Sequence, residues 1–191
     1  MVGKLELISE RVGLCIVDVQ EKLAATMPEK VLKGTLRNWL NLIETARVMR
    51  LAVAVSAQSP KVMGRSLPVV AESVLRLPRE EVLLFEKQRF SCVTTPEFLA
   101  WAKRVGKDQW IVAGMETHVA VYQTVRDLVA AGHTVHVPRD AVISRTMANW
   151  EIGLSLAQQS GGIVTSTEAV IFDLLKEGSS ENFAALSRVI K

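Results

Sequence analysis

The fold of this chain is decided by residues 111–132, IVAGMETHVAVYQTVRDLVAAG. The stretch begins with an apolar run that is typical of a buried strand. Gly114 allows a tight turn, and Thr117 is expected to cap the following helix with its hydroxyl. Apolar residues then recur at helical spacing up to Gly132, a residue type that commonly ends helices. The stretch therefore predicts a strand, a tight turn and a helix.

Similar apolar runs recur along the chain, and helical patterns separate them. The predicted strands are residues 12–19, 51–57, 81–85, 110–113, 133–137 and 163–164. Further helices are predicted at 31–50, 97–105, 147–159, 167–175 and 183–190, with loops at 20–28 and 58–78. This alternation indicates right-handed βαβ units. We expect a single α/β domain over residues 1–191, a Rossmann-like three-layer α/β/α fold with a six-stranded parallel sheet in the order 3-2-1-4-5-6.

The composition is that of an ordinary globular chain of 191 residues, with 49% hydrophobic and 23% charged residues. The net charge is +3 and no run of five Lys or Arg residues occurs, which makes nucleic acid a disfavoured partner. Two cysteines do not form a disulfide framework and indicate a reducing compartment. We expect no membrane span and a cytoplasmic location, with a mitochondrial location as the alternative.

Polar residues follow the predicted strands at the edge where parallel strands place a ligand crevice. Asp18 closes the first strand and Lys87 follows the third. A neighbouring Asp and Lys shift each other's pKa and can serve in proton transfer, although an ordinary salt bridge is the alternative. Position 120 falls on the first turn of a helix, which favours an anion, but the residue is Ala120. The site therefore has no nucleophile at the place where one would be activated.

Metal and cofactor sites are not expected. His133 and His136 point to opposite faces of a strand, and His118 has no His four residues away. No Gly-rich phosphate-binding motif follows any predicted strand.

Five segments, in this order, resemble the isochorismatase-like cysteine hydrolases, most closely the isochorismatase-domain-containing subgroup. They are VDVQ (17–20), AQSPK (57–61) with Gly64, EKQRFS (86–91), GMETHVA (114–120) and DAVISR (140–145). The resemblance covers essentially the whole chain. It implies a parallel sheet flanked by helices, often in homo-oligomers, and no cofactor. The nicotinamidase branch and its metal are disfavoured, because residues 56–61 contain no His or Asp.

The resemblance also implies roles for individual residues. The family's catalytic triad is Asp, Lys and Cys, so Asp18 would be the general base and Lys87 would stabilise charge. Ala120 occupies the position of the nucleophilic Cys. A non-proline cis peptide is expected between Met115 and Glu116, and the amides of Glu116 and Ala120 would form the oxyanion hole.

The expected substrate is a small amide, ester or vinyl ether, or a small anion. Its expected neighbours are Gln20, Gln58, Phe90 and Tyr122. Three interpretations remain open: a hydrolase that is impaired or inactive without its Cys, a non-catalytic oligomeric binding or scaffold protein, and a mitochondrial-associated ribonuclease-like protein. Asp18 and Lys87 acting directly on water is a further route. A homodimer or tetramer is expected, with the helices beside the sheet at its interface.

Overall fold

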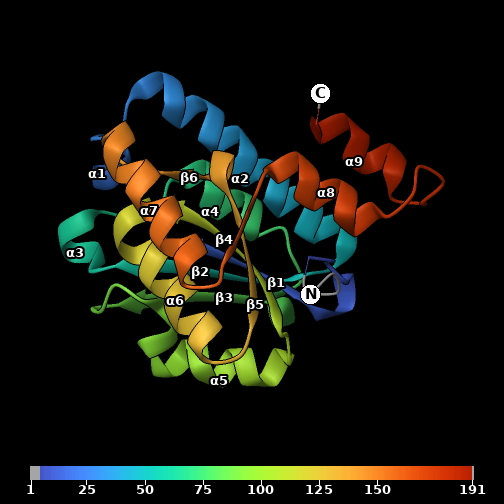
Figure 1. Ribbon diagram of the computed structural model, residues 1–191, viewed down its shortest axis with the longest axis horizontal. Helices are drawn as coiled ribbons and strands as arrows, with labels where there is room; N and C mark the ends of the chain where they lie inside the picture. Colours follow the sequence, from blue (N-terminus) through green and yellow to red (C-terminus); the bar gives the residue numbers. More distant parts are fainter. Residues whose placement is uncertain (1–4, 191) are drawn as a thin grey trace.

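A computed structural model describes residues 5–190 and contains one parallel sheet with helices on both faces (Figure 1). The strands are β1 (Val12–Val17), β2 (Ala52–Gln58), β3 (Val82–Lys87), β4 (Gln109–Met115), β5 (Thr134–Pro138), β6 (Val142–Ile143) and β7 (Ile163–Thr165). Their order is β3-β2-β1-β4-β5-β7, and every pairing is parallel. The predicted fold class and strand order are confirmed. The seventh strand, β6, pairs with the end of β4 and is too short to leave a sequence pattern.

The longer helices lie close to their predicted positions. They are α1 (Glu21–Ala24), α2 (Glu29–Met49), α3 (Pro60–Met63), α4 (Pro68–Val74), α5 (Pro96–Val105), α6 (Tyr122–Ala130), α7 (Met147–Gln159), α8 (Thr167–Leu175) and α9 (Phe183–Ile190). The predicted loops at 20–28 and 58–78 were wrong in part, because they hold α1, α3 and α4. These helices are too short for a periodic pattern, and α3 and α4 begin with a proline whose fixed φ suits a first turn.

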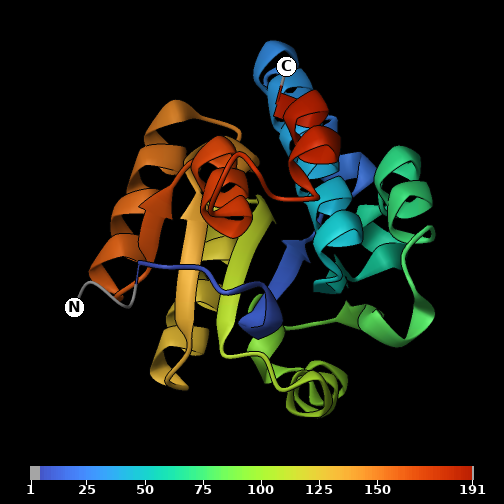
Figure 2. The same cartoon turned by 90° about the vertical axis from the view of Figure 1, so that its right-hand side faces the viewer.

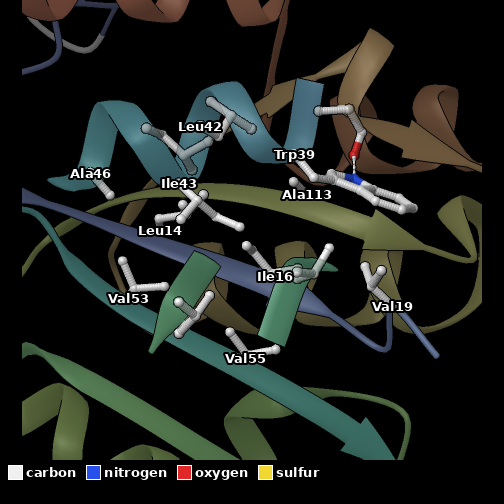
Figure 3. Packing of buried hydrophobic residues seen from close by; sticks show 14 of the residues in the cluster. Leu14, Ile16, Val19, Trp39, Leu42, Ile43, Ala46, Val53, Val55 and Ala113 are labelled. Carbon is white, nitrogen blue, oxygen red and sulfur yellow. Dashed lines mark hydrogen bonds between the residues drawn. The ribbon is translucent and has the colours of Figure 1, made fainter. Parts of the chain in front are cut away.

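The two faces of the sheet carry separate apolar cores. Strand residues alternate between them, so Leu14 and Ile16 of β1 face α2, α4 and α8, whereas Cys15 and Val17 face α5, α6 and α7. On the first face, the Trp39 indole of α2 donates a 2.7 Å hydrogen bond to the carbonyl of Ala141 (Figure 3). This bond fixes α2 beside β6, next to the crevice.

The C-terminal helix α9 packs beside α2 (Figure 2). Leu186 is fully buried there with Ile171 and Leu175 of α8. Helix α8 is capped by Ser166, whose hydroxyl accepts from the Ala169 N–H. In residues 5–190 no helix combines the length and hydropathy needed to cross a membrane.

Candidate functional site

The ends of β1, β2 and β3 bring a buried ion pair together. Lys87 Nζ lies 2.6 Å from Asp18 Oδ2, and the two side chains are 0% and 2% exposed. The same ammonium donates to Gln58 Oε1 at 2.9 Å. The register explains this proximity, because Gln58 of β2 pairs with Lys87 of β3, while Asp18 directly follows β1. The predicted approach of Asp18 and Lys87 is confirmed by this geometry.

Ser56 holds the second oxygen of the carboxylate. Its hydroxyl donates to Asp18 Oδ1 at 2.7 Å and accepts a hydrogen bond from the Asp18 backbone N–H at 3.2 Å. Asp18 has a φ of 51°, in the left-handed region that Asp and Asn tolerate better than other non-glycine residues. Sequence reasoning did not find Ser56, because a single Ser inside an apolar strand gives no signal of its partner.

Burial raises the pKa of the Asp18 carboxyl above its usual range. The charge and hydrogen bond of Lys87 act in the opposite direction, as does the hydrogen bond from Ser56, but burial is the larger effect. A buried carboxylate with a raised pKa accepts a proton more readily than a solvated one. The pair can therefore serve a proton-transfer step as well as a structural one.

The four residues predicted to contact substrate differ in how close they lie to the Asp18–Lys87 pair. Gln58 touches Lys87, whereas Gln20 is one step away: its amide donates to the carbonyls of Gln58 and Gly64 and accepts from the Gln58 N–H. Phe90 is 49% exposed in the loop after β3, and Tyr122 is half-buried with the Arg126 guanidinium 5.6 Å from its ring. Gln20 thus holds the ends of β1 and β2 together, and Gln58 is the nearer of the two glutamines to the ion pair.

The turn after β4 depends on Gly114. Its φ is 120°, and a Cβ there would collide with the Val17 backbone, including the nitrogen at 2.6 Å. Only glycine lets β4 approach β1 this closely. The peptide bond between Met115 and Glu116 is cis, as predicted.

The helix after this turn begins differently from the prediction. Residues Thr117–Val121 form a π-helical turn, and α6 starts only at Tyr122. The expected Thr117 cap was wrong: its buried hydroxyl has no hydrogen-bond partner among the described residues. The wider turn instead directs the N–H groups of Val119 and Val121 to the Glu116 carbonyl, at 3.1 and 3.3 Å. A π-turn has no signature in the local sequence.

Ala120 is 2% exposed and belongs to the apolar group that includes Cys15, Val17 and Cys92. From the other side, α7 approaches the turn so closely that a Cβ on Gly153 would lie 2.6 Å from the His118 nitrogen. The turn is therefore held between β1 and α7. The side chain at position 120, where the resemblance led us to expect the nucleophile's place, is a buried methyl group.

Polar contacts from the β6 region complete the turn. Arg145 Nε donates to Glu116 Oε1 at 3.0 Å, and His118 Nδ1 lies 3.1 Å from the Ser144 hydroxyl. The DAVISR segment (140–145) thus contacts the turn through its last two residues, Ser144 and Arg145. Within residues 5–190, no group of three or more His, Cys, Asp or Glu side chains is arranged to hold a metal ion.

A cavity of about 240 Å³ lies against Lys87. Gln88 and Arg89 line it after β3, and Thr94 and Thr95 line it before α5. The Ser91 hydroxyl, in the loop between these residues, is buried and has no hydrogen-bond partner among the described residues. The cavity therefore has a mostly polar lining at the end of β3.

Comparison with known proteins places the chain in one family. Residues 12–169 match the family model described as the isochorismatase domain. The chain is 31% identical over 182 residues to the secreted isochorismatase effector Isc1 of Phytophthora sojae, covering 93% of this chain and 83% of that protein.

Solved structures with the same fold include the MAR1 ribonuclease of Caenorhabditis elegans. It has a TM-score of 0.89 and 29% identity, and the match covers 97% of this chain and 92% of that one. The YcaC gene product of Escherichia coli, described as an octameric hydrolase of unknown specificity, has a TM-score of 0.86 and 18% identity, with coverage of 97% and 89%.

Proposed function

Because the chain belongs to the isochorismatase family, we propose that its Asp18–Lys87 pair is the charged part of a hydrolase-type site that binds a small amide, ester or vinyl ether. The observation that carries the proposal is the combination of this buried 2.6 Å pair with Ala120. The charged groups are present, but the thiolate needed for a covalent intermediate is missing from position 120. Covalent hydrolysis through that position is therefore lost, and binding is retained.

Each group has a proposed role. Asp18 is the proton acceptor, and its raised pKa suits that task. Lys87 balances negative charge, and the amides of Glu116 and Ala120 bind the substrate oxygen. Alanine keeps the backbone N–H that a cysteine would have, so a carbonyl or small anion can still be held at the turn.

Substrate contacts are proposed from the surrounding side chains. Gln58 is in contact with Lys87 and would orient the polar end of the ligand, with Gln20 keeping Gln58 in place. Phe90 and Tyr122 would supply apolar contact. We propose that hydrolysis by this chain would proceed by direct attack of water, with Asp18 as base.

A second candidate is a non-catalytic, homo-oligomeric binding protein. Ala120 favours it directly, since alanine removes the chemistry while leaving the fold intact. The octameric state given for the E. coli structure makes self-association a reasonable expectation for a chain with the same fold. RNA cleavage, after the name of the C. elegans protein, ranks behind both, because the chain has a net charge of only +3 and 5% aromatic residues.

The test is Ala120→Cys, with Ala120→Ser as the matched control. A thiol at position 120 would gain from the helix dipole and from the charge of Lys87, so iodoacetamide should label it near pH 7 faster than it labels a free cysteine. Labelling at position 120 is followed by peptide mass spectrometry, and both variants are assayed on small amides, esters and vinyl ethers. A thiol at position 120 that reacts no faster than free cysteine would remove the support for a hydrolase-type site and favour the scaffold candidate.

A further inference from the structure

We propose that a groove between α2 and α7 is a binding site for a small aromatic monocarboxylate. None of its lining residues belongs to the Asp18–Lys87 pair or to the turn at Thr117–Val121, so the inference does not depend on the hydrolase proposal. It rests on the size and lining of the groove, on a glycine in one wall, and on the charges at its edges.

The groove is a cavity of about 410 Å³, a volume within the range of small-molecule sites. The N-terminal half of α2 and the first turn of α7 form its walls, and β6 forms its floor (Figure 1). Val142 and Ile143 of the floor are 2% and 1% exposed, whereas Val31 and Met147 on the walls are 49% and 65% exposed. Apolar side chains left in contact with solvent above a closed floor are typical of a site that a ligand covers.

Gly34 keeps the α2 wall of the groove open. It lies inside a helix of 21 residues, where glycine is less favourable than alanine. A Cβ at this position would meet no atom within 4 Å, so the packing of the chain does not require a glycine there. Because Gly34 lines the groove, the missing side chain leaves room for a flat ligand against the helix backbone.

Trp150 gives the α7 wall a fixed aromatic surface. Its indole N–H donates to the carbonyls of Arg139 and Val142, both at 3.1 Å, and these bonds hold the ring in one orientation. The Arg139 guanidinium lies 4.9 Å from the centre of the ring. Met147 on the same wall adds a thioether, which makes favourable contacts with aromatic groups. This lining favours a flat aromatic ligand.

The charges of the lining favour an anion. Two cations line the groove, Lys30 from α2 and Arg139 from the turn η6 (Arg139–Ala141), and within residues 5–190 neither forms an ion pair. Among the described lining residues Asp140 is the only carboxylate, and its Oδ1 accepts from the backbone N–H and the hydroxyl of Thr167 at 2.8 and 2.9 Å. Two cations against one carboxylate leave one positive charge, which the single carboxylate of the ligand neutralises.

The experiment titrates the wild-type protein with 2-naphthoate near pH 7 and follows binding by isothermal titration calorimetry. We expect a dissociation constant on the order of 10–100 μM, and binding at least about fivefold weaker for 2-naphthalenemethanol, a neutral analogue of similar size. Gly34→Leu should weaken naphthoate binding at least about tenfold, because the leucine fills the groove. Arg37→Leu is the matched control: it places the same side chain on an exposed part of α2 outside the lining, and it should leave the affinity unchanged.

A second variant tests the charges. Lys30→Gln combined with Arg139→Gln should weaken naphthoate binding about threefold or more and leave binding of the alcohol unchanged. Circular dichroism and urea unfolding establish that each variant is folded.

Three results would overturn the proposal. No binding of 2-naphthoate up to about 1 mM, or binding no tighter than that of the alcohol, would show that the groove does not recognise an aromatic carboxylate. Unchanged naphthoate binding in a folded Gly34→Leu variant would place the ligand elsewhere, for example at the Asp18–Lys87 pair. A change of assembly mass in light scattering for Gly34→Leu, but not for Arg37→Leu, would show that a second copy of the chain occupies the groove instead.

Discussion

Removing one partner of the Asp18–Lys87 pair should have a large and pH-dependent effect. Lys87→Met replaces the ammonium with an apolar group of similar length and leaves the Asp18 carboxylate in a site where it is 2% exposed. Breaking a buried pair in this way costs about 3–5 kcal/mol of unfolding free energy. For a domain of this size, that corresponds to a loss of roughly 6–20 °C in melting temperature.

The pH dependence follows from the direction of the Asp18 pKa. Burial already raises this pKa in the native protein, and Lys87 opposes the rise. Without Lys87 the pKa rises further, so the folded variant takes up a proton at a higher pH than the unfolded chain does. Its stability deficit is then largest near pH 7 and shrinks as the pH falls through the raised pKa, because the neutral carboxyl no longer needs a countercharge.

The assay is urea unfolding near pH 7 and pH 5, followed by tryptophan fluorescence, for which the chain has four Trp residues. The matched control is the double variant Asp18→Asn with Lys87→Met, which removes both charges and should recover most of the lost stability. A deficit below about 1 kcal/mol, or one that grows toward acid pH, would show that the pair is solvated and would refute this reasoning.

Other predictions concern packing, chemistry and assembly. Gly153→Ala should lower the unfolding free energy by more than about 1 kcal/mol, because the new Cβ would lie 2.6 Å from the His118 nitrogen. Gly34→Ala is the control. It should stabilise the protein by about 0.4–1 kcal/mol, since nothing lies within 4 Å of a Cβ at that position. Equal effects in urea unfolding would contradict the packing of α7 on the turn. Ala120→Cys should create a fast-reacting thiol at position 120, and the iodoacetamide labelling described under Proposed function measures this. Light scattering at micromolar concentration should give a dimer or larger assembly, and a monomer mass would refute it. Any RNA binding that is found should weaken steeply with salt, and filter binding over a salt series measures this.

The sheet could be predicted from the sequence because its signal is local. Apolar runs such as 12–19 and 51–57 are buried on both faces, and the helices between them force parallel strands. Strand β6 and helices α1 and α3 escaped prediction because they have only two to four residues, which is one strand repeat or about one helical turn and too few for a periodic pattern. Their positions are set by tertiary contacts, such as the pairing of β6 with the end of β4.

The site was predictable where strand ends and family motifs marked it. Asp18 and Lys87 are 69 residues apart in the chain, and strand order alone places both at one edge without giving their distance. Ser56 carries no motif, so its contact with Asp18 emerges only when β1 and β2 are packed together. The π-turn at Thr117–Val121 was mistaken for an ordinary capped helix, because the close packing that Gly114 and Gly153 permit around it leaves no local sequence pattern.

The left-handed backbone at Asp18 has a consequence for which side chains could replace it. A φ of 51° favours Asp, Asn and Gly over other residues, and of these three only Asp brings a charge into a buried site. If folding stability alone were optimised, drift would lead toward an uncharged pair, Asn at position 18 with an apolar residue at position 87. An uncharged pair would meet the demands of folding, so the charged pair at this corner is expected to serve the chemistry proposed for the site.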